Sequence, residues 1–177
     1  FFLWAPLNFD DLCVHYQLFE DSLGRPLSSV GALMPTYDAL DDLPGIEDPA
    51  ARHMRNHEHR LQFDDGSRIV HTADLSFTAV DDGSLYEFNL ERIFTFRMKG
   101  IGYHHPEWGH GAWKGDLAMA SERWDLSDVD DQAFENQHCQ HLVRATLGDR
   151  VGIGVLEQLC IGPYKPYGFD GFVGRSG

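Results

Sequence analysis

Two copies of the tetrapeptide Asp-Asp-Gly-Ser, at residues 64–67 and 81–84, constrain the fold of this chain more than any other feature. They separate three runs of strand length, which span residues 53–63, 68–80 and 85–98. Asp-Gly between alternating runs is the strongest short-range signal for a β-hairpin, because a type I′ turn needs positive φ at both central residues. The sequence therefore predicts an antiparallel meander in the middle of the chain.

Alternation within the two later runs predicts which face of each strand is buried. In the first of them, one face carries Ile69, His71, Ala73, Leu75 and Phe77. In the second, Arg92 interrupts a face that carries Tyr86, Phe88, Leu90, Phe94 and Phe96. Successive side chains of a strand point to opposite faces, so we expect these residues to lie against a common core.

The rest of the chain contains further segments that are typical of strands. These segments span residues 12–19, 27–34, 111–122, 138–146 and 150–161. Residues 35–51 are rich in Asp and Pro and predict a long loop, while the acidic residues 127–136 could hold one helical turn. About eight antiparallel strands with almost no helix signal predict an all-β fold, either a β-barrel or a β-sandwich. Gly152 and Gly154 fall inside a predicted strand, where they indicate a bend or a close packing contact.

Charge and composition exclude several classes of partner. Acidic residues outnumber basic ones by 28 to 14, which gives a formal net charge of -14. Such a chain repels a nucleic-acid backbone and an anionic membrane surface. No apolar run approaches the roughly 18 residues of a membrane helix, so we expect no membrane span. Cys13, Cys139 and Cys160 are too widely spaced for a zinc knuckle or a disulfide framework, and they favour a cytoplasmic location.

Residues 100–113 hold the densest set of reactive side chains. Tyr103, His105 and Glu107 follow each other at intervals of two, so an extended backbone places them on one face. A phenol, an imidazole and a carboxyl group that point the same way can divide the work of acid–base catalysis. His110 is a further acid–base candidate. We expect the rings of the tryptophans at positions 108 and 113 to wall an apolar pocket for the ligand.

Two other groups of residues offer alternatives. His53, His57 and His59 would share one strand face, and together with the histidines of residues 104–110 they leave a metalloenzyme open. No His-Glu-x-x-His motif accompanies them, and we expect neither a metal nor an organic cofactor. Asp11 and His15 fall on one face at the start of a predicted strand, and we place them in the ligand pocket.

A family resemblance is carried by residues 100–109, Gly-Ile-Gly-Tyr-His-His-Pro-Glu-Trp-Gly. They resemble the pattern Gly-x-x-aromatic-x-Asp-x-x-Trp-Gly of the lipocalin-like proteins related to carotenoid 1,2-hydratase (hydroxyneurosporene synthase) and the AttH proteins. His105 stands where that pattern has Asp. Residues 4–11, 107–115 and 152–158 look similar to a bacterial branch of the same group. The resemblance implies a lipocalin-like domain over residues 1–177, corresponding to the C-terminal half of a two-domain protein, with a preceding lipocalin-like domain as its partner.

The resemblance also implies a function. In the hydratases, an acid of the motif protonates an isoprenoid double bond without a cofactor, and water captures the resulting cation. We therefore expect a cofactor-independent hydratase, lyase or isomerase that acts on a terpenoid, steroid or lipid-like molecule. His105 or Glu107 would be the acid or base, and Tyr103 its hydrogen-bonding partner. The alternative hypotheses are a protein that binds a hydrophobic ligand without catalysis, and the metalloenzyme.

Overall fold

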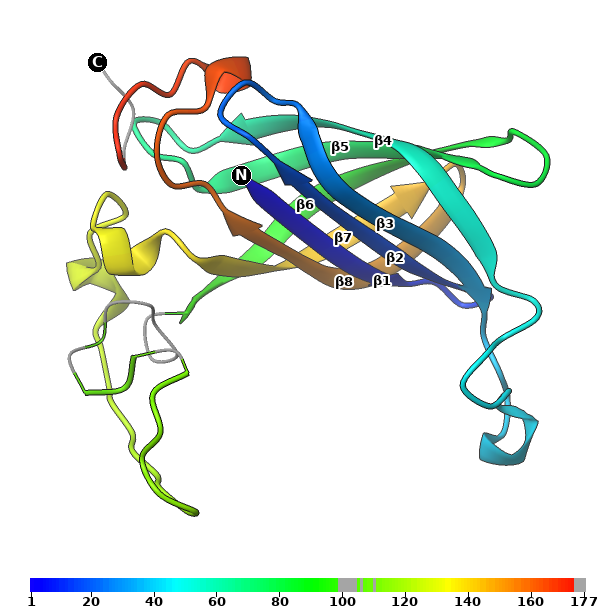
Figure 1. Cartoon of the computed structure of the whole chain (residues 1–177), viewed down its shortest axis with the longest axis horizontal. Coiled ribbons are helices and arrows are strands. Elements are labelled where there is room, and N and C mark those ends of the chain that lie inside the picture. Colours follow the sequence, from blue (N-terminus) through cyan, green and yellow to red (C-terminus); the bar gives the residue numbers. More distant parts are fainter. Residues whose placement is uncertain (99–104, 106, 110, 174–177) are drawn as a thin grey trace.

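A computed structural model describes residues 1–98, 105, 107–109 and 111–173, and these residues form a closed barrel of antiparallel strands (Figure 1). The strands are β1 (Phe2–Asn8), β2 (Leu12–Glu20), β3 (Pro26–Pro35), β4 (Arg52–Phe63), β5 (Val70–Ala79), β6 (Leu85–Arg97), β7 (Cys139–Leu147) and β8 (Arg150–Leu159). Each strand pairs with its neighbours in sequence, and β1 pairs with β8 to close the sheet. The predicted all-β antiparallel fold is confirmed, and its sheet closes into a lipocalin-like barrel instead of forming a sandwich.

The two Asp-Asp-Gly-Ser segments connect β4 to β5 and β5 to β6, as predicted, but with a different turn geometry. Gly66 and Gly83 have positive φ, at 70° and 75°. Asn56 is the only non-glycine residue with positive φ among the described residues, so Asp65 and Asp82 exclude a type I′ turn. A longer hairpin loop needs positive φ only at its left-handed residue, and glycine supplies it.

A β-bulge in β6 corrects the predicted burial of its second half. The pairing of β6 with β7 shifts register between Arg92 and Phe94. The extra residue reverses the alternation, so Phe94 and Phe96 lie outside the barrel and are each 51% exposed. Phe88 and Leu90, which precede the bulge, are buried as predicted.

Two other strand predictions also differ from the structure, at His71 and at residues 111–122. His71, expected on the buried face of β5, is exposed and lies 3.4 Å from an Asp64 carboxylate oxygen. Within residues 111–122 the structure contains no strand. Gly111 and Gly115 have φ of 79° and 107°, which interrupts an extended backbone, and β6 already pairs with β7. The N-terminal run that forms β1 takes the remaining place in the barrel.

Apolar side chains fill the middle of the barrel. The largest fully buried ones include Tyr16, Phe77, Leu3, Leu7 and Leu18. An eight-stranded barrel is just wide enough for side chains to fill it. The predicted packing contact at Gly154 is confirmed, because a Cβ atom there would lie 2.3 Å from the carbonyl oxygen of Pro6.

Polar side chains replace this apolar core at the end of the barrel where β1 begins and β8 ends. Arg92 donates to the two carboxylate oxygens of Asp64 at 2.6 and 3.0 Å. Arg68 is fully buried and donates to backbone carbonyl groups of the segment that follows β8. In Figure 1 the N-terminus and the segment that follows β8 lie at the same end of the barrel. That end is therefore the one where polar chemistry is concentrated.

The helices that the structure describes are single 3₁₀ turns. They are η1 (Leu40–Asp42), η3 (Leu126–Asp128), η4 (Phe134–Asn136) and η5 (Lys165–Tyr167). The acidic segment 127–136 thus overlaps two such turns. No described helix has the length and apolar character needed to cross a membrane.

Candidate functional site

The barrel is closed, but β3 and β4 pair over a much shorter stretch than its other neighbouring strands do. These strands pair only through Ala32 with His53 and Leu33 with Arg52 in the part of the chain that the structure describes. Beyond that point Leu27 of β3 is 70% exposed. A cavity of about 480 Å³ that is open to solvent lies beside this short stretch of pairing. Its walls come from the β2–β3 hairpin, from β4 and from the segment around η5.

A buried cluster of a carboxylate, an imidazole and two phenols lines this cavity. Nε2 of His59 lies 3.1 Å from Oε2 of Glu20, and Nδ1 lies 2.8 Å from the hydroxyl of Tyr167. The hydroxyl of Tyr164 donates to the same oxygen of Glu20. Alternation along β2 and β4 turns Glu20 and His59 inward, and η5 brings Tyr167 over the end of the barrel. Segments distant in sequence thus converge on one carboxylate.

The hydrogen bonds determine which oxygen of Glu20 remains free. The amide of Leu61 donates to the Tyr167 oxygen at 3.0 Å, so the phenol can give its own proton to Nδ1 of His59. With Glu20 ionised, Nε2 of His59 must carry the proton that bridges to Oε2. Tyr164 donates to Oε2 as well. Oε1 accepts no hydrogen bond from the described residues and is the atom of the cluster that can exchange a proton with a ligand.

Burial keeps the two phenols protonated. The side chains of Glu20 and His59 are 9% and 7% exposed. The ring of Phe1 stacks on His59 and Tyr164, with centroids 4.9 and 4.4 Å away. Burial, reinforced by the Glu20 carboxylate, raises the pKa of Tyr164, and burial raises the pKa of Tyr167 to about 12. Both phenols therefore act as donors at neutral pH.

His57 lines the same cavity from β4 and is 8% exposed. Burial lowers its pKa, so the ring is neutral. The prediction that His53 shares a face with His57 and His59 is wrong. A register shift between Arg55 and Glu58, with positive φ at Asn56, puts His53 outside the barrel and the other two inside.

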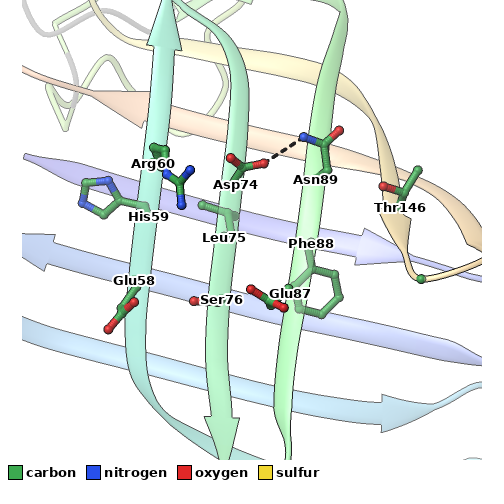
Figure 2. Close-up of a pocket in the computed structure, with 11 residues that line it drawn as sticks. Glu58, His59, Arg60, Asp74, Leu75, Ser76, Glu87, Phe88, Asn89 and Thr146 are labelled. Atoms are coloured by element: carbon green, nitrogen blue, oxygen red, sulfur yellow. Dashed lines mark hydrogen bonds between the residues drawn. The ribbon is translucent and has the colours of Figure 1, made fainter.

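A second hollow, of about 500 Å³, lies across the outer face of β4, β5 and β6 (Figure 2). Arg60, Asp74 and Asn89 are cross-strand neighbours there, and Asn89 donates to Asp74 at 2.9 Å. Glu58 and Glu87 line it further along. Its charged groups are exposed, and water and salt weaken such charges. The buried cluster around Glu20 is therefore the stronger candidate for chemistry.

Only part of the predicted site at residues 100–113 falls on described residues. Tyr103 and His110 lie outside them. His105 accepts backbone N–H groups of Glu107 and Trp108 at Nδ1, at 3.1 and 2.9 Å, and its Nε2 lies 2.7 Å from Glu122. Both nitrogens of this ring are thus occupied within its own loop.

The remaining predicted residues are dispersed. Trp113 is 78% exposed, and Trp108 packs under the ammonium group of Lys114, 5.6 Å from the ring centre. Asp11 is exposed and forms an ion pair with Arg150 at 3.2 Å, on the outside of the barrel. His15 faces outward from β2, against Trp4. The structure does not place these residues beside the cavity at Glu20.

Among the described residues, no three His, Cys, Asp or Glu side chains converge closely enough to hold a metal ion. The metalloenzyme alternative thus has no ligand set in that part of the chain.

The sequence reasoning missed Glu20, Tyr164 and Tyr167, and included His59 only as a metal ligand. Glu20 ends a strand at a turn, where a carboxylate is usually solvated. The only available signal was the inward register of Val14, Tyr16 and Leu18, which Glu20 continues.

Comparisons with known proteins connect the chain to one family. No curated protein sequence matches it, and no solved structure does. One family model matches residues 1–170, which is nearly the whole chain. The chain therefore belongs to DUF8625, a family of unknown function.

Proposed function

We propose that this protein is a cofactor-independent acid–base enzyme, a hydratase, lyase or isomerase, and that its substrate is a hydrophobic small molecule bound beside Glu20. The observation that carries the proposal is the asymmetric Glu20 carboxylate. One of its oxygens is held by His59 and Tyr164, the other has no hydrogen bond from the described residues, and the side chain lines a cavity of about 480 Å³. Such a group combines fixed orientation with a free site for a proton.

The proposed reaction is proton transfer to a double bond. The Glu20 carboxylic acid gives its proton to one alkene carbon, water adds to the other carbon, and a proton of that water returns to the carboxylate. The donors His59 and Tyr164 stabilise the carboxylate that forms between the two transfers. The aromatic rings of Tyr164 and Tyr167 face the same cavity and favour a cationic intermediate. In an isomerase, loss of a proton from carbon would replace the addition of water.

The resemblance of residues 100–109 to the hydratases supports the same reaction class and a terpenoid, steroid or lipid-like substrate. The roles of His105, Glu107, Tyr103 and His110 stay predictions, and the proposal assigns the proton to Glu20 instead. The preceding lipocalin-like domain is likewise proposed from the resemblance. The free thiols of Cys13, Cys139 and Cys160 support a cytoplasmic location.

The test measures incorporation of solvent deuterium into a panel of mono- and sesquiterpenoid alkenes and alcohols by mass spectrometry. We expect incorporation by the wild type and a loss of about 100-fold or more in Glu20→Gln, the usual contribution of a general acid. Glu58→Gln is the matched control, since this exposed carboxylate lines the same cavity. Glu107→Gln tests the competing assignment.

An unaltered rate in Glu20→Gln, or an equal loss in Glu58→Gln, contradicts the role of Glu20. Thermal stabilisation by members of the panel without any deuterium incorporation favours the binding protein over the enzyme.

A further inference from the structure

Both ring nitrogens of His57, beside the short pairing between β3 and β4, are buried and lack hydrogen bonds. Nε2 of His15, on the outer face of β2, is also buried without a hydrogen bond. Among the described residues a single further buried side-chain atom, in Gln137, shares this condition. A buried polar atom without a partner costs free energy, so this concentration is unusual.

His57 is wedged into its position by close packing. Its ring meets Tyr16 and Phe77 edge-on, with centroids 5.0 and 5.6 Å away. On the third side lies Gly31, where a Cβ atom would be 2.4 Å from Nε2. The carbonyl of Val30 is near enough to favour the charged ring, yet one carbonyl can serve one nitrogen at most. Both nitrogens are therefore shielded from solvent, although the residue lines the cavity beside Glu20.

The pairing between β3 and β4, which we call the seam, lies beside His57 and is the shortest strand pairing in the described barrel. Two residue pairs join β3 to β4, whereas β2 and β3 pair over nine. The free half of β3 exposes Leu27 and Val30, by 70% and 51%. Few hydrogen bonds therefore oppose separation of the two strands next to the ring.

We propose that His57 forms an acid-sensitive gate, whose protonation separates β3 from β4 and widens the cavity beside Glu20. The identity of the ligand that the gate admits rests on the proposed function. The separation of β3 from β4 does not depend on it.

The surroundings of His57 explain the direction of this switch. Tyr16 faces it from β2, whereas His15 lies on the outer face of that strand. From β3 and β5, His57 meets only Gly31, the Val30 carbonyl and Phe77. Glu58 and Arg55, its neighbours on β4, are exposed. No carboxylate pairs with the ring, so an added proton needs water. Burial lowers the pKa of His57, the Val30 carbonyl partly opposes this, and His15 lowers it further. Protonation therefore favours the state in which the seam is open and the ring is hydrated.

The experiment is hydrogen–deuterium exchange of the ligand-free protein, with each rate divided by the intrinsic rate at that pH. In the wild type, we expect exchange of residues 26–33 and 52–60 to rise about tenfold for each pH unit below the ordinary histidine pKa of about 6.5. Exchange in β7 and β8 should not rise with it. His57→Leu should abolish the rise, while His53→Leu, which changes an exposed histidine of the same strand, should retain it. His15→Gln should weaken it and provides a second variant if His57→Leu does not fold.

A flat pH profile in the wild type overturns the gate, as does a rise that persists in His57→Leu. These results are independent of the deuterium incorporation that tests Glu20, so either proposal can fail alone.

Discussion

Acid should destabilise this barrel through His141, and the size of the effect follows from the contacts of the ring. His141 is fully buried in β7. Gln158 Oε1 already accepts from the amide of Val70, so Nε2 of His141, 2.9 Å away, donates to it. Thr95 can then donate to Nδ1 at 3.0 Å. This network satisfies a neutral ring and offers no anionic partner to a charged one.

The pKa of His141 is lowered from 6.5 to about 4, chiefly by burial and further by Arg92 and Arg97, although Gln158 and Asp64 oppose this. The unfolded chain therefore takes up the proton at a higher pH than the folded chain does. The stabilisation is complete above about pH 6.5 and is lost as the pH falls towards 4. At about 1.4 kcal/mol for each tenfold difference in proton affinity, the loss at pH 4 is about 3 kcal/mol.

Urea unfolding of the wild type and His141→Gln between about pH 7 and about pH 4 tests this value. The stability difference between the two proteins should shift by about 3 kcal/mol against the wild type over that range. His53→Gln, which removes an exposed histidine, controls for the general effect of losing one imidazole. A difference that stays constant within about 0.5 kcal/mol refutes the reasoning, because burial would then not set the proton affinity of His141.

Two further predictions concern packing. Gly154→Ala should destabilise the barrel by about 1–3 kcal/mol, because the added methyl meets a backbone carbonyl of β1. Gly45→Ala, with no atom within 4 Å of the new Cβ, should change the stability little. Equal effects of the two substitutions in thermal unfolding would contradict the packing argument. Phe94→Ala should lower the free energy of unfolding by about 1 kcal/mol or less, whereas Phe88→Ala should lower it by about 3–5 kcal/mol. Comparable losses for the two variants in urea unfolding would mean that the bulge does not turn Phe94 outward.

Local patterns predicted much of the fold. Alternation and the two Asp-Gly turns predicted the β4–β5–β6 meander, and Gly154 was correctly placed at a close contact. Local patterns failed at bulges, because one extra residue reverses every later side chain and leaves no mark in the alternation. Phe94 and Phe96 were misplaced for that reason, and His53 was misplaced by the shift in β4.

The candidate site was less predictable than the fold. Residues 100–113 were predicted to form the site because their reactive groups are close in sequence. The Glu20 cluster draws one residue each from β2, β4, η5 and the chain preceding it, and no window of the sequence contains them together. Closure of the barrel brings them within hydrogen-bonding distance.

The sequence by itself determined the antiparallel strands β2 to β8, most of their boundaries and the acidic surface, because these depend on the polarity of neighbouring residues and on turn chemistry. It did not predict β1, and it predicted a strand at residues 111–122 that the structure lacks. The tertiary structure alone decided that the sheet closes through β1 and β8, that β3 and β4 pair over only a short stretch, and that Glu20 is buried with one free oxygen. These features depend on register and on contacts between distant segments, which local spacing does not encode.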